Sequence, residues 1–404
     1  MRKFLSALTF AATATFMAQP ALAADPIRIG IPTPVQLATG KDTVDAAQMA
    51  VDEINAAGGV LGRQLEIVVA DEGTSPETGI GAVQHLINTD EADVLIGGYV
   101  SGVVLAELPH ISEAGIVYLG VGASSPKVTA QVASNYEDYK GIFRVSPPNA
   151  AHQGAQSITL VKDVVMGELG MKKIAILMED AAWAQGTLPP IRDGIEKAGG
   201  EVVSVETFEV SLTDFSPVMA RLASSGAEFV FTLLSASQSE SLVRQWHDAQ
   251  MPFMLGGIHT KAQAADYFER IGGAADTEIA ANLVMRAPIT EKTIPFWDAF
   301  VDKTGRTPVY TGPGAYDAVH VFAEAAERAG SLDHDALIKA LEETDYLGTN
   351  GRVVFEKNHD VRTGPGGANI VFAQWREDGS RPIISPADLR AADTKVVLPS
   401  WLRK

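Results

Sequence analysis

The chain has 404 residues, of which 46% are hydrophobic, and it carries a formal net charge of −18 with no cysteine. This length is enough for two domains with separate hydrophobic cores. The negative charge argues against nucleic acid or an anionic membrane surface as a partner, and the lack of cysteine excludes disulfides and thiolate chemistry. We therefore expect a freely diffusing protein with no nucleic-acid partner.

The N-terminus has the pattern of a secretory signal. A basic start, Met1-Arg2-Lys3, is followed by an apolar run from Phe4 to Met17 and by the small-x-small end Ala21-Leu22-Ala23. The apolar run is shorter than the ~20 residues that a membrane-spanning helix needs. We predict a signal peptide over residues 1–23 that is cleaved after Ala23. Export of a chain without disulfides favours a bacterial periplasm.

Short β-branched runs alternate with helical stretches in the order expected of parallel sheets that helices cover on both faces. Strands are predicted over 27–31, 65–70, 94–97, 116–120, 174–178, 202–208, 229–234 and 253–255. After residue 285, helices are predicted over 294–304, 316–329 and 335–343, and strands over 351–356 and 370–375.

The two halves of the chain repeat the same pattern of predicted strands and helices. The first copy has a helix ending Val51-Asp-Glu-Ile-Asn-Ala-Ala-Gly-Gly59, and the second has one ending Arg192-Asp-Gly-Ile-Glu-Lys-Ala-Gly-Gly200. Matching elements are separated by roughly one α/β domain length. Two similar lobes imply a cleft between them, which is where small ligands usually bind.

The lobe boundaries follow from this repeat and from the break at Ser146-Pro147-Pro148-Asn149. We predict lobe 1 over 24–146 plus about 284–345, and lobe 2 over 147–283 plus about 346–380. Residues 381–404 are expected to form a tail packed on the body. Before one helix, Ser75 is predicted as N-cap and Pro76 as the first helical residue.

Enzyme motifs are missing from the sequence. It contains no His-Glu-x-x-His, no phosphate loop and no Gly-x-Ser-x-Gly elbow, and its eight histidines lack metal-ligand spacing. Adjacent carboxylates such as Glu179 and Asp180 point different ways in regular structure, so solvated positions are expected for them. We predict that the protein is not an enzyme and that it uses no cofactor and no metal.

Small polar turns follow two predicted strands of the first half, Gly97–Gly102 and Gly122–Pro126. Hydroxyls and backbone N–H groups at the start of a helix suit an anion such as a carboxylate. The alternative is that Ser101 and Ser124 only cap their helices. In the second half, Trp183 could form an apolar wall of the cleft or could pack within its own lobe.

These residues resemble the periplasmic solute-binding proteins of ABC importers, of the leucine/isoleucine/valine-binding type. The resemblance covers essentially the whole mature chain. It rests on Val51-Asp-Glu-Ile-Asn-Ala-Ala-Gly-Gly-Val-Leu-Gly62, Ile96-Gly97…Ser101, Gly122-Ala-Ser-Ser-Pro126, Phe143-Arg144 and Asp214-Phe215-Ser216…Leu222. It implies an α/β fold of two Rossmann-like lobes with parallel sheets, joined by a three-crossover hinge, and a monomer that docks on membrane permease subunits.

The resemblance also implies where the ligand lies. Ser101, Ala123 and Ser124 match in type the residues that hold the ligand's carboxylate, and Trp183 matches the aromatic residue of the second lobe. Two positions depart from the pattern, since Gly257 lies where an acid usually holds the ligand's ammonium, and Thr39 lies where an aromatic residue is expected. The predicted ligand-binding residues are Ser101, Gly102, Gly122, Ala123, Ser124, Trp183, Ser235 and Gly257.

The expected function is therefore the capture of a small amino acid of branched-chain type, or a related small carboxylate, by closure of two lobes. An amide, urea or an aromatic carboxylate is the alternative ligand, because no acid is present near Gly257. A ligand sensor that presents to a membrane receptor would use the same closure. An exported α/β enzyme would need a catalytic constellation that the sequence does not show.

Overall fold

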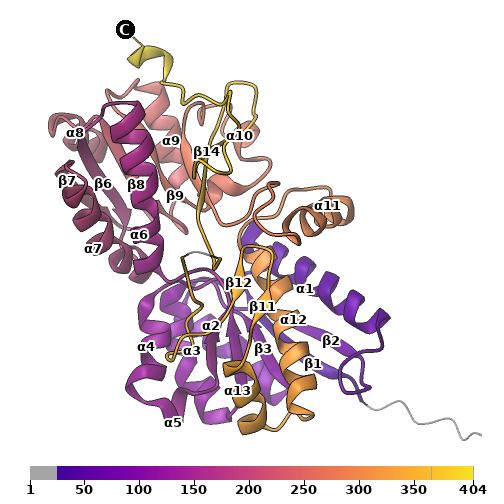
Figure 1. The fold of residues 1–404 in the computed structure, drawn as a ribbon. Helices are drawn as coiled ribbons and strands as arrows, with labels where there is room; N and C mark the ends of the chain where they lie inside the picture. The colour runs from indigo at the N-terminus through magenta and orange to yellow at the C-terminus, as the bar shows by residue number, and fades with distance from the viewer. Residues whose placement is uncertain (1–24, 365, 404) are drawn as a thin grey trace, which may run out of the picture.

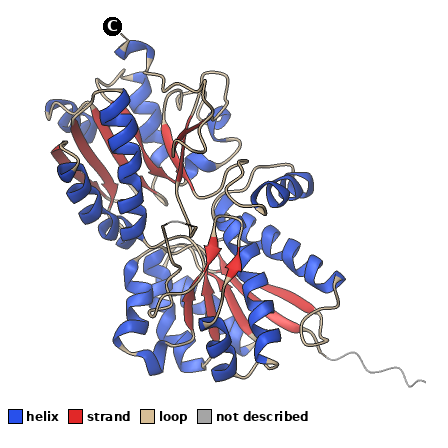
Figure 2. Ribbon diagram, in the orientation of Figure 1, coloured by secondary structure: helices blue, strands red, loops and turns tan. Residues whose placement is uncertain are grey.

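The computed structural model describes residues 25–364 and 366–403, so the predicted signal peptide lies outside the described residues. Two α/β lobes are stacked one above the other, and each has a central sheet with helices on both faces (Figures 1 and 2). Several segments run between the lobes (Figure 1). This is the two-lobed fold that the sequence repeat predicted.

Lobe 1 contains a five-stranded sheet in the order β2-β1-β3-β4-β5, and its strands are all parallel. The strands are β1 (Ile27–Thr33), β2 (Leu65–Asp71), β3 (Val94–Gly97), β4 (Val117–Gly120) and β5 (Ile142–Arg144). The helices are α1 (Ala38–Ala56), α2 (Pro76–Asn88), α3 (Ser101–Ala114), α4 (Pro126–Ser134), α5 (Tyr136–Tyr139), α11 (Thr293–Thr304), α12 (Thr311–Ala329) and α13 (His334–Glu342).

Lobe 2 contains a seven-stranded sheet in the order β14-β13-β10-β9-β8-β6-β7. Its strands are β6 (Lys173–Glu179), β7 (Glu201–Phe208), β8 (Phe229–Leu234), β9 (Met254–His259), β10 (Ile279–Asn282), β13 (Val371–Gln374) and β14 (Ile383–Ser385). Its helices are α6 (Ala150–Thr159), which continues as a π-helix over Leu160–Glu168, and α7 (Ala182–Lys197), α8 (Ser216–Ser224), α9 (Ser239–Asp248) and α10 (Tyr267–Arg270). The sheet is mixed rather than wholly parallel, because β13 is antiparallel to both of its neighbours.

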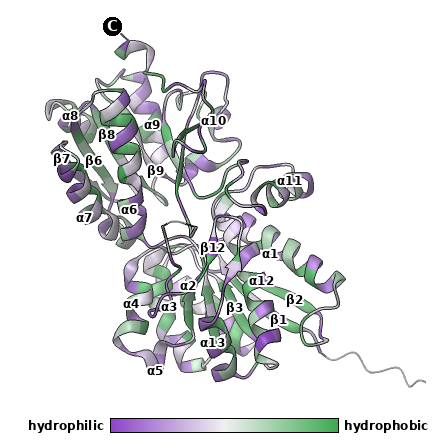
Figure 3. Ribbon diagram, in the orientation of Figure 1, coloured by the Kyte–Doolittle hydropathy of each residue, from purple (hydrophilic) through white to green (hydrophobic). Residues whose placement is uncertain are grey.

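Each sheet is apolar because helices cover both of its faces (Figure 3). In lobe 1, Ile29 and Leu119 of the sheet pack in one core with Phe322 of α12. In lobe 2, Val230 of the sheet packs with Trp246 of α9. Full burial of such a side chain contributes about 1.5–3 kcal/mol, which lets each lobe hold together without disulfides.

Local rules account for the helix ends. The Ser75 side chain accepts a hydrogen bond from the Thr78 N–H at 3.3 Å, and Pro76 opens α2, as predicted. After α1, Gly59 has a φ of 81°, and a Cβ there would lie 2.0 Å from the Arg63 carbonyl oxygen. Only glycine fits this turn.

The predicted lobe boundary near residue 345 is wrong. The short hairpin of β11 (Tyr346–Leu347) and β12 (Arg352–Val353) packs in the lobe 1 core, and so do Phe355 and Val361. The chain thus returns to lobe 2 only after residue 361. The reason is that these apolar side chains cover the same core as α12 and α13.

The C-terminal segment packs on lobe 2. Its first part is β14, which adds a strand to the lobe 2 sheet, and Trp401 contacts Trp246 with ring centroids 5.3 Å apart. The Trp401 indole N–H also donates to the Met251 carbonyl at 2.9 Å. Within residues 25–364 and 366–403, no helix has both the length and the apolar character that crossing a membrane requires.

Candidate functional site

A cavity of about 380 Å³ lies between the lobes. Lobe 1 lines it with the turns that follow β3 and β4, and lobe 2 lines it with residues at or after the ends of β6, β8, β9 and β10. The carboxyl ends of parallel strands are where open α/β sheets bind ligands. The two lobes thus present their binding edges to one shared space.

Six of the eight predicted binding residues line this cavity. They are Ser101, Gly102, Gly122, Ser124, Trp183 and Ser235. Ala123 does not line it, because its side chain packs in the lobe 1 core. Gly257 does not line it either, because it lies within β9, which continues to His259 and so extends past the predicted strand end at residue 255. A Cβ on Gly257 would lie 2.4 Å from the Thr232 carbonyl oxygen of the next strand, so its lack of a side chain serves sheet packing.

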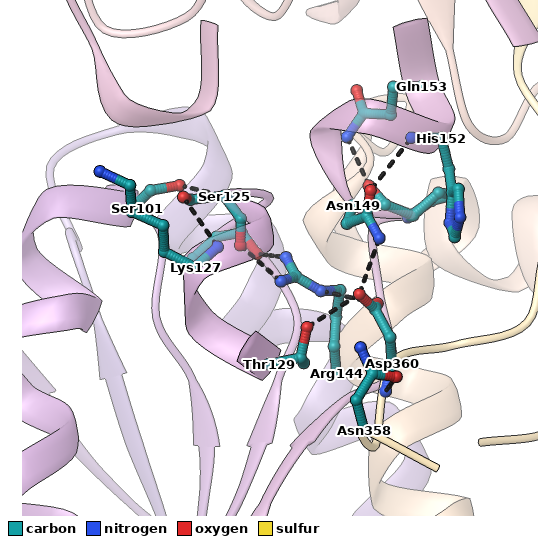
Figure 4. Close-up of polar contacts among 12 residues, drawn as sticks. Ser101, Ser125, Lys127, Thr129, Arg144, Asn149, His152, Gln153, Asn358 and Asp360 are labelled. Atoms are coloured by element: carbon teal, nitrogen blue, oxygen red, sulfur yellow. Dashed lines mark hydrogen bonds and ion pairs between the residues drawn. The ribbon is translucent and has the colours of Figure 1, made fainter. Parts of the chain in front are cut away.

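The two serines of lobe 1 do not cap their own helices. Val100 is the N-cap of α3, with no side-chain cap bond, and Ser125 rather than Ser124 caps α4 by accepting from the Lys127 N–H. The Ser101 hydroxyl instead accepts from the Ser125 N–H at 3.1 Å, which ties the two polar turns together (Figure 4). This leaves the Ser101 hydroxyl hydrogen free to donate toward the cavity.

A buried arginine holds the second polar turn in place (Figure 4). Arg144, at the end of β5, donates to the carbonyl of Ala123 and, at 2.7 Å, to that of Ser125. Its Nε lies 2.9 Å from Asp360 Oδ1, and both side chains are almost fully buried. Arg144 thus fixes the backbone on either side of Ser124, which lines the cavity.

Asp360 carries this network into lobe 2. Its other oxygen accepts from the Thr129 hydroxyl at 2.9 Å and from the Asn149 amide at 2.8 Å. Asn149 caps α6, the first helix of lobe 2, by accepting from the His152 N–H. The ion pair therefore joins three parts of the chain: the polar turn Gly122–Pro126, helix α4, and Asn149 at the start of α6, where the chain enters lobe 2 (Figure 4).

Tyr99 reaches across the cavity from lobe 1. Its hydroxyl lies 2.8 Å from the Ser235 hydroxyl of lobe 2, and its N–H donates to Glu72 at 2.7 Å. Burial, aided by the negative charge of Glu179, raises the pKa of Tyr99 to about 12, so the phenol is neutral at physiological pH. Burial and the neighbouring Glu107 raise the pKa of Glu72 well above its usual range.

Glu179 contradicts the expectation of a solvated carboxylate. It is fully buried at the cavity wall, while its neighbour Asp180 is exposed at the cavity and accepts from the Gln185 amide. One Glu179 oxygen accepts from the Trp183 indole at 2.9 Å, and the other accepts from the Ser235 N–H at 3.0 Å. Alternation along β6 does separate the two carboxylates, but it turns one of them inward.

Tyr310, which precedes α12, also lines the cavity. Its hydroxyl donates to the Gly122 carbonyl of lobe 1 at 2.8 Å, and its N–H donates to Gln263 of lobe 2 at 3.2 Å. Gln263 in turn donates to the Ala281 carbonyl at 3.0 Å. Tyr310 thus links the two lobes through its hydroxyl and its backbone N–H.

The cavity wall is acidic and apolar in lobe 2. Its described lining residues include two acids, Glu179 and Asp180, and no lysine, arginine or histidine. Lobe 1 contributes hydroxyls and the free N–H groups at the start of α3, which carry partial positive charge. The arrangement can hold a small solute that directs an anionic or hydrogen-bond-accepting end to lobe 1 and an apolar body to Trp183.

A Ser–His–acid arrangement occurs in lobe 2, away from the cavity. His259 lies 2.8 Å from the Ser239 hydroxyl and 2.6 Å from Glu278, which also accepts from the Tyr267 hydroxyl. Ser239, His259, Glu278 and Tyr267 are each at most about 1% exposed, and none of them lines the cavity. A nucleophile needs access to substrate, so this cluster acts as a structural tie between α9, β9 and α10.

Several polar lining residues escaped sequence reasoning. They are Thr74, Tyr99, Gln153, Glu179, Asp180, Thr260, Gln263, Asn282 and Tyr310. Tyr99 lies within the polar turn Gly97–Gly102, and Glu179 directly follows a predicted strand. The sequence therefore carries a signal for these two residues. The others come from segments without a motif, such as the chain before α12 and the end of β10.

Comparison with known proteins places this architecture in a family. The family model described as "Periplasmic binding protein" matches residues 26–380, and the chain belongs to this family. It is 29% identical over 367 residues to the Leu/Ile/Val-binding protein homolog 3 of Brucella melitensis, covering 89% of this chain and 94% of that protein.

Solved structures share the fold. A leucine binding protein from Thermotoga maritima superimposes with a TM-score of 0.76 at 19% identity, covering 90% of this chain and all of that one. A solute binding protein of an ABC transporter from R. palustris, solved in complex with benzoate, gives a TM-score of 0.74 at 17% identity, covering 91% of this chain and 99% of that one. The fold is therefore that of the type I periplasmic binding proteins.

Proposed function

We propose that this protein is the periplasmic substrate-binding component of an ABC importer and that it captures a small amino acid or a related small carboxylate. The observation that carries the proposal is the cavity between the lobes, with the start of α3 and the Ser101–Ser125 link on one side. The predicted signal peptide and the family membership support the periplasm as its location and a membrane permease as its partner.

In the proposed mechanism, lobe 1 binds the ligand first. A carboxylate placed at the start of α3 would meet the hydroxyls of Ser101 and Ser124 and helix N–H groups that have no partner within the helix. Lobe 2 then closes by a hinge motion, bringing Trp183 and Ser235 onto the ligand. Closure removes the ligand's polar groups from water, so each of them needs a partner in the cavity.

The choice between an amino acid and a carboxylate without an ammonium depends on lobe 2. All the acceptor positions of Glu179 are taken by protein donors, and Asp180 is exposed. This favours the second candidate, an aromatic or aliphatic carboxylate without an α-ammonium. A structural relative solved with benzoate shows that the fold accommodates such a ligand.

A thermal-shift screen of the mature protein tests the proposal. The panel contains L-leucine, L-isoleucine, L-valine, benzoate, acetamide and urea, because native-state binding raises the melting temperature by mass action. We expect a shift with at least one carboxylate, and a loss of roughly 1–3 kcal/mol of its binding free energy in Ser124→Ala. A folded protein that responds to none of the carboxylates would contradict the proposal.

A shift with benzoate and none with leucine would identify the second candidate. A shift with leucine would mean that Asp180 or a backbone carbonyl holds the ammonium. A shift only with acetamide or urea would replace the carboxylate by an amide.

A further inference from the structure

Glu179 has an unusual environment for a buried acid. Four donors point at its carboxylate: the Trp183 indole at 2.9 Å and the N–H groups of Ser235, Ala236 and Ser237 at 3.0, 3.4 and 3.1 Å. A carboxylate accepts about four hydrogen bonds, so this one has no acceptor position left for a ligand. None of its four partners is a cation.

The groups that Glu179 holds form the ligand-facing wall of lobe 2. Trp183, Ser235 and Ala236 line the cavity together with Glu179, whose side chain is fully buried and whose oxygens are turned to these protein donors. The loop of residues 235–237 has neither helical nor strand pairing of its own, so its N–H groups depend on this carboxylate. One side chain therefore sets the position of both the tryptophan and the loop.

The loop of residues 235–237 also makes one of the hydrogen bonds between the lobes. The Ser235 hydroxyl meets the Tyr99 hydroxyl of lobe 1 at 2.8 Å, and the Tyr99 N–H is held by Glu72. At its other end, the loop leads to Ser239, which is tied to His259. A chain of hydrogen bonds thus runs from Glu72 through Tyr99 and Ser235 to Glu179.

We propose that Glu179 is the positioning residue of the binding site: it does not bind the ligand but fixes the Trp183 and Ser235 wall that closes over it. The proposal rests on the proposed function, since it concerns the same cavity. It predicts that loss of Glu179 loosens the closed state and leaves the first encounter of ligand with lobe 1 unchanged.

The first test needs no ligand. Amide hydrogen exchange of the full mature chain is compared for wild type, Glu179→Ala and Asp180→Asn. Removing the carboxylate should speed exchange at residues 235–237 by about tenfold, the effect of losing hydrogen bonds to a charged group. Asp180→Asn, which changes the neighbouring exposed acid, should leave these amides at the wild-type rate.

The second test uses L-leucine or benzoate, whichever raises the melting temperature of the wild type. In Glu179→Ala the dissociation rate constant should rise by about tenfold, with the association rate constant within about twofold of wild type, because the lobe 2 wall contacts ligand only after closure. A residue that merely stabilised the fold would lower the melting temperature without separating the two rate constants. Glu179→Gln, which keeps the size and one carbonyl acceptor, gives the same comparison if the alanine variant does not fold.

Unchanged exchange at residues 235–237 in the folded variants would overturn the proposal, and so would equal changes in both rate constants. If the wild type binds neither probe, the proposed function fails for these ligands. The exchange experiment still decides the role of Glu179 in that case.

Discussion

At the scale of single residues, a buried ion pair lies beside the second polar turn of lobe 1. Arg144 and Asp360 form an ion pair at 2.9 Å with side chains 1% and 2% exposed. Such a pair is costly to desolvate, but removing one partner is far worse than keeping both. Its position behind Ala123 and Ser125 makes the fold of the site depend on it.

Replacement of Arg144 by methionine should lower the free energy of unfolding by about 3–5 kcal/mol, because Asp360 is then buried without a charge partner. Urea unfolding of the mature protein measures this change. Arg352→Met is the matched control, since the Arg352–Asp345 pair is exposed and should contribute less than ~1 kcal/mol. Equal losses in the two variants would contradict the role given to Arg144.

Glu107 on α3 is a buried acid whose protonation has a measurable effect on stability. Neither of its oxygens has a hydrogen-bond partner, and burial raises its pKa to about 8. Between the unfolded-state value near 4.5 and the folded value near 8, the folded protein keeps a proton that the unfolded chain has released. Stability from this group is therefore present at low pH and is lost as pH rises through that window.

The variant Glu107→Gln should match the wild type near pH 5 and exceed its free energy of unfolding by roughly 4 kcal/mol at pH 9. Unfolding at a series of pH values checks this prediction. Glu113→Gln changes an exposed acid on the same helix and should stay within about 0.5 kcal/mol of wild type. A difference that shrinks as pH rises would have the wrong sign and would refute the assignment.

At the scale of elements, the proposed closure brings α7 of lobe 2 against the start of α4 of lobe 1. Gly186 lies at this contact, where a Cβ would be 2.8 Å from the Pro126 ring. The backbone of Gly186 is helical, a conformation that other residues adopt more readily than glycine. Its small size is what the lobe contact requires.

Gly186→Leu should therefore weaken binding of the ligand found in the thermal-shift screen by at least about tenfold, because the side chain holds the lobes apart. Titration calorimetry measures the affinity. Gly81→Leu adds the same side chain to an exposed helical position with no atom near the new Cβ, and it should bind like the wild type. Wild-type affinity in Gly186→Leu would show that the lobes need not approach this closely.

Elements also show where local sequence is informative. The long strands with β-branched residues, β1, β6 and β8, were predicted close to their observed bounds. β10 was missed because Ile279–Asn282 is half alanine, and β5 because it has three residues. β14 was missed because it becomes a strand only where β13 offers an edge to pair with.

At the scale of the whole molecule, hydrogen bonds link the two lobes around the cavity. The Tyr99–Ser235 hydrogen bond crosses the cavity, and the Tyr310 hydroxyl donates to the Gly122 carbonyl. These links stabilise the arrangement in which the lobes meet, and a ligand that binds this arrangement better shifts the population toward it.

Tyr99→Phe should shift the ligand-free protein toward the open state by roughly two- to tenfold, the equivalent of one hydrogen bond. Small-angle scattering reports the change as a larger radius of gyration. Tyr118→Phe removes a buried hydroxyl that donates to Gly97 within lobe 1, so it is the matched control for a lost bond that does not cross the cavity. Identical scattering of Tyr99→Phe and wild type would mean that this bond does not contribute to closure.

The amino-acid sequence by itself determined the two-lobed α/β architecture and the polar turns after β3 and β4, because hydrophobic periodicity, helix stops and small residues act over a few positions. Only the tertiary structure decided that Glu179 is buried and saturated, that Arg144 supports the turn of Ala123 and Ser125, and that Tyr99 meets Ser235 136 positions away in the chain. Burial of a charge and pairing between lobes depend on which distant surfaces meet. No local sequence pattern encodes which distant surfaces meet, so the wall of lobe 2 follows only from the packing of both lobes.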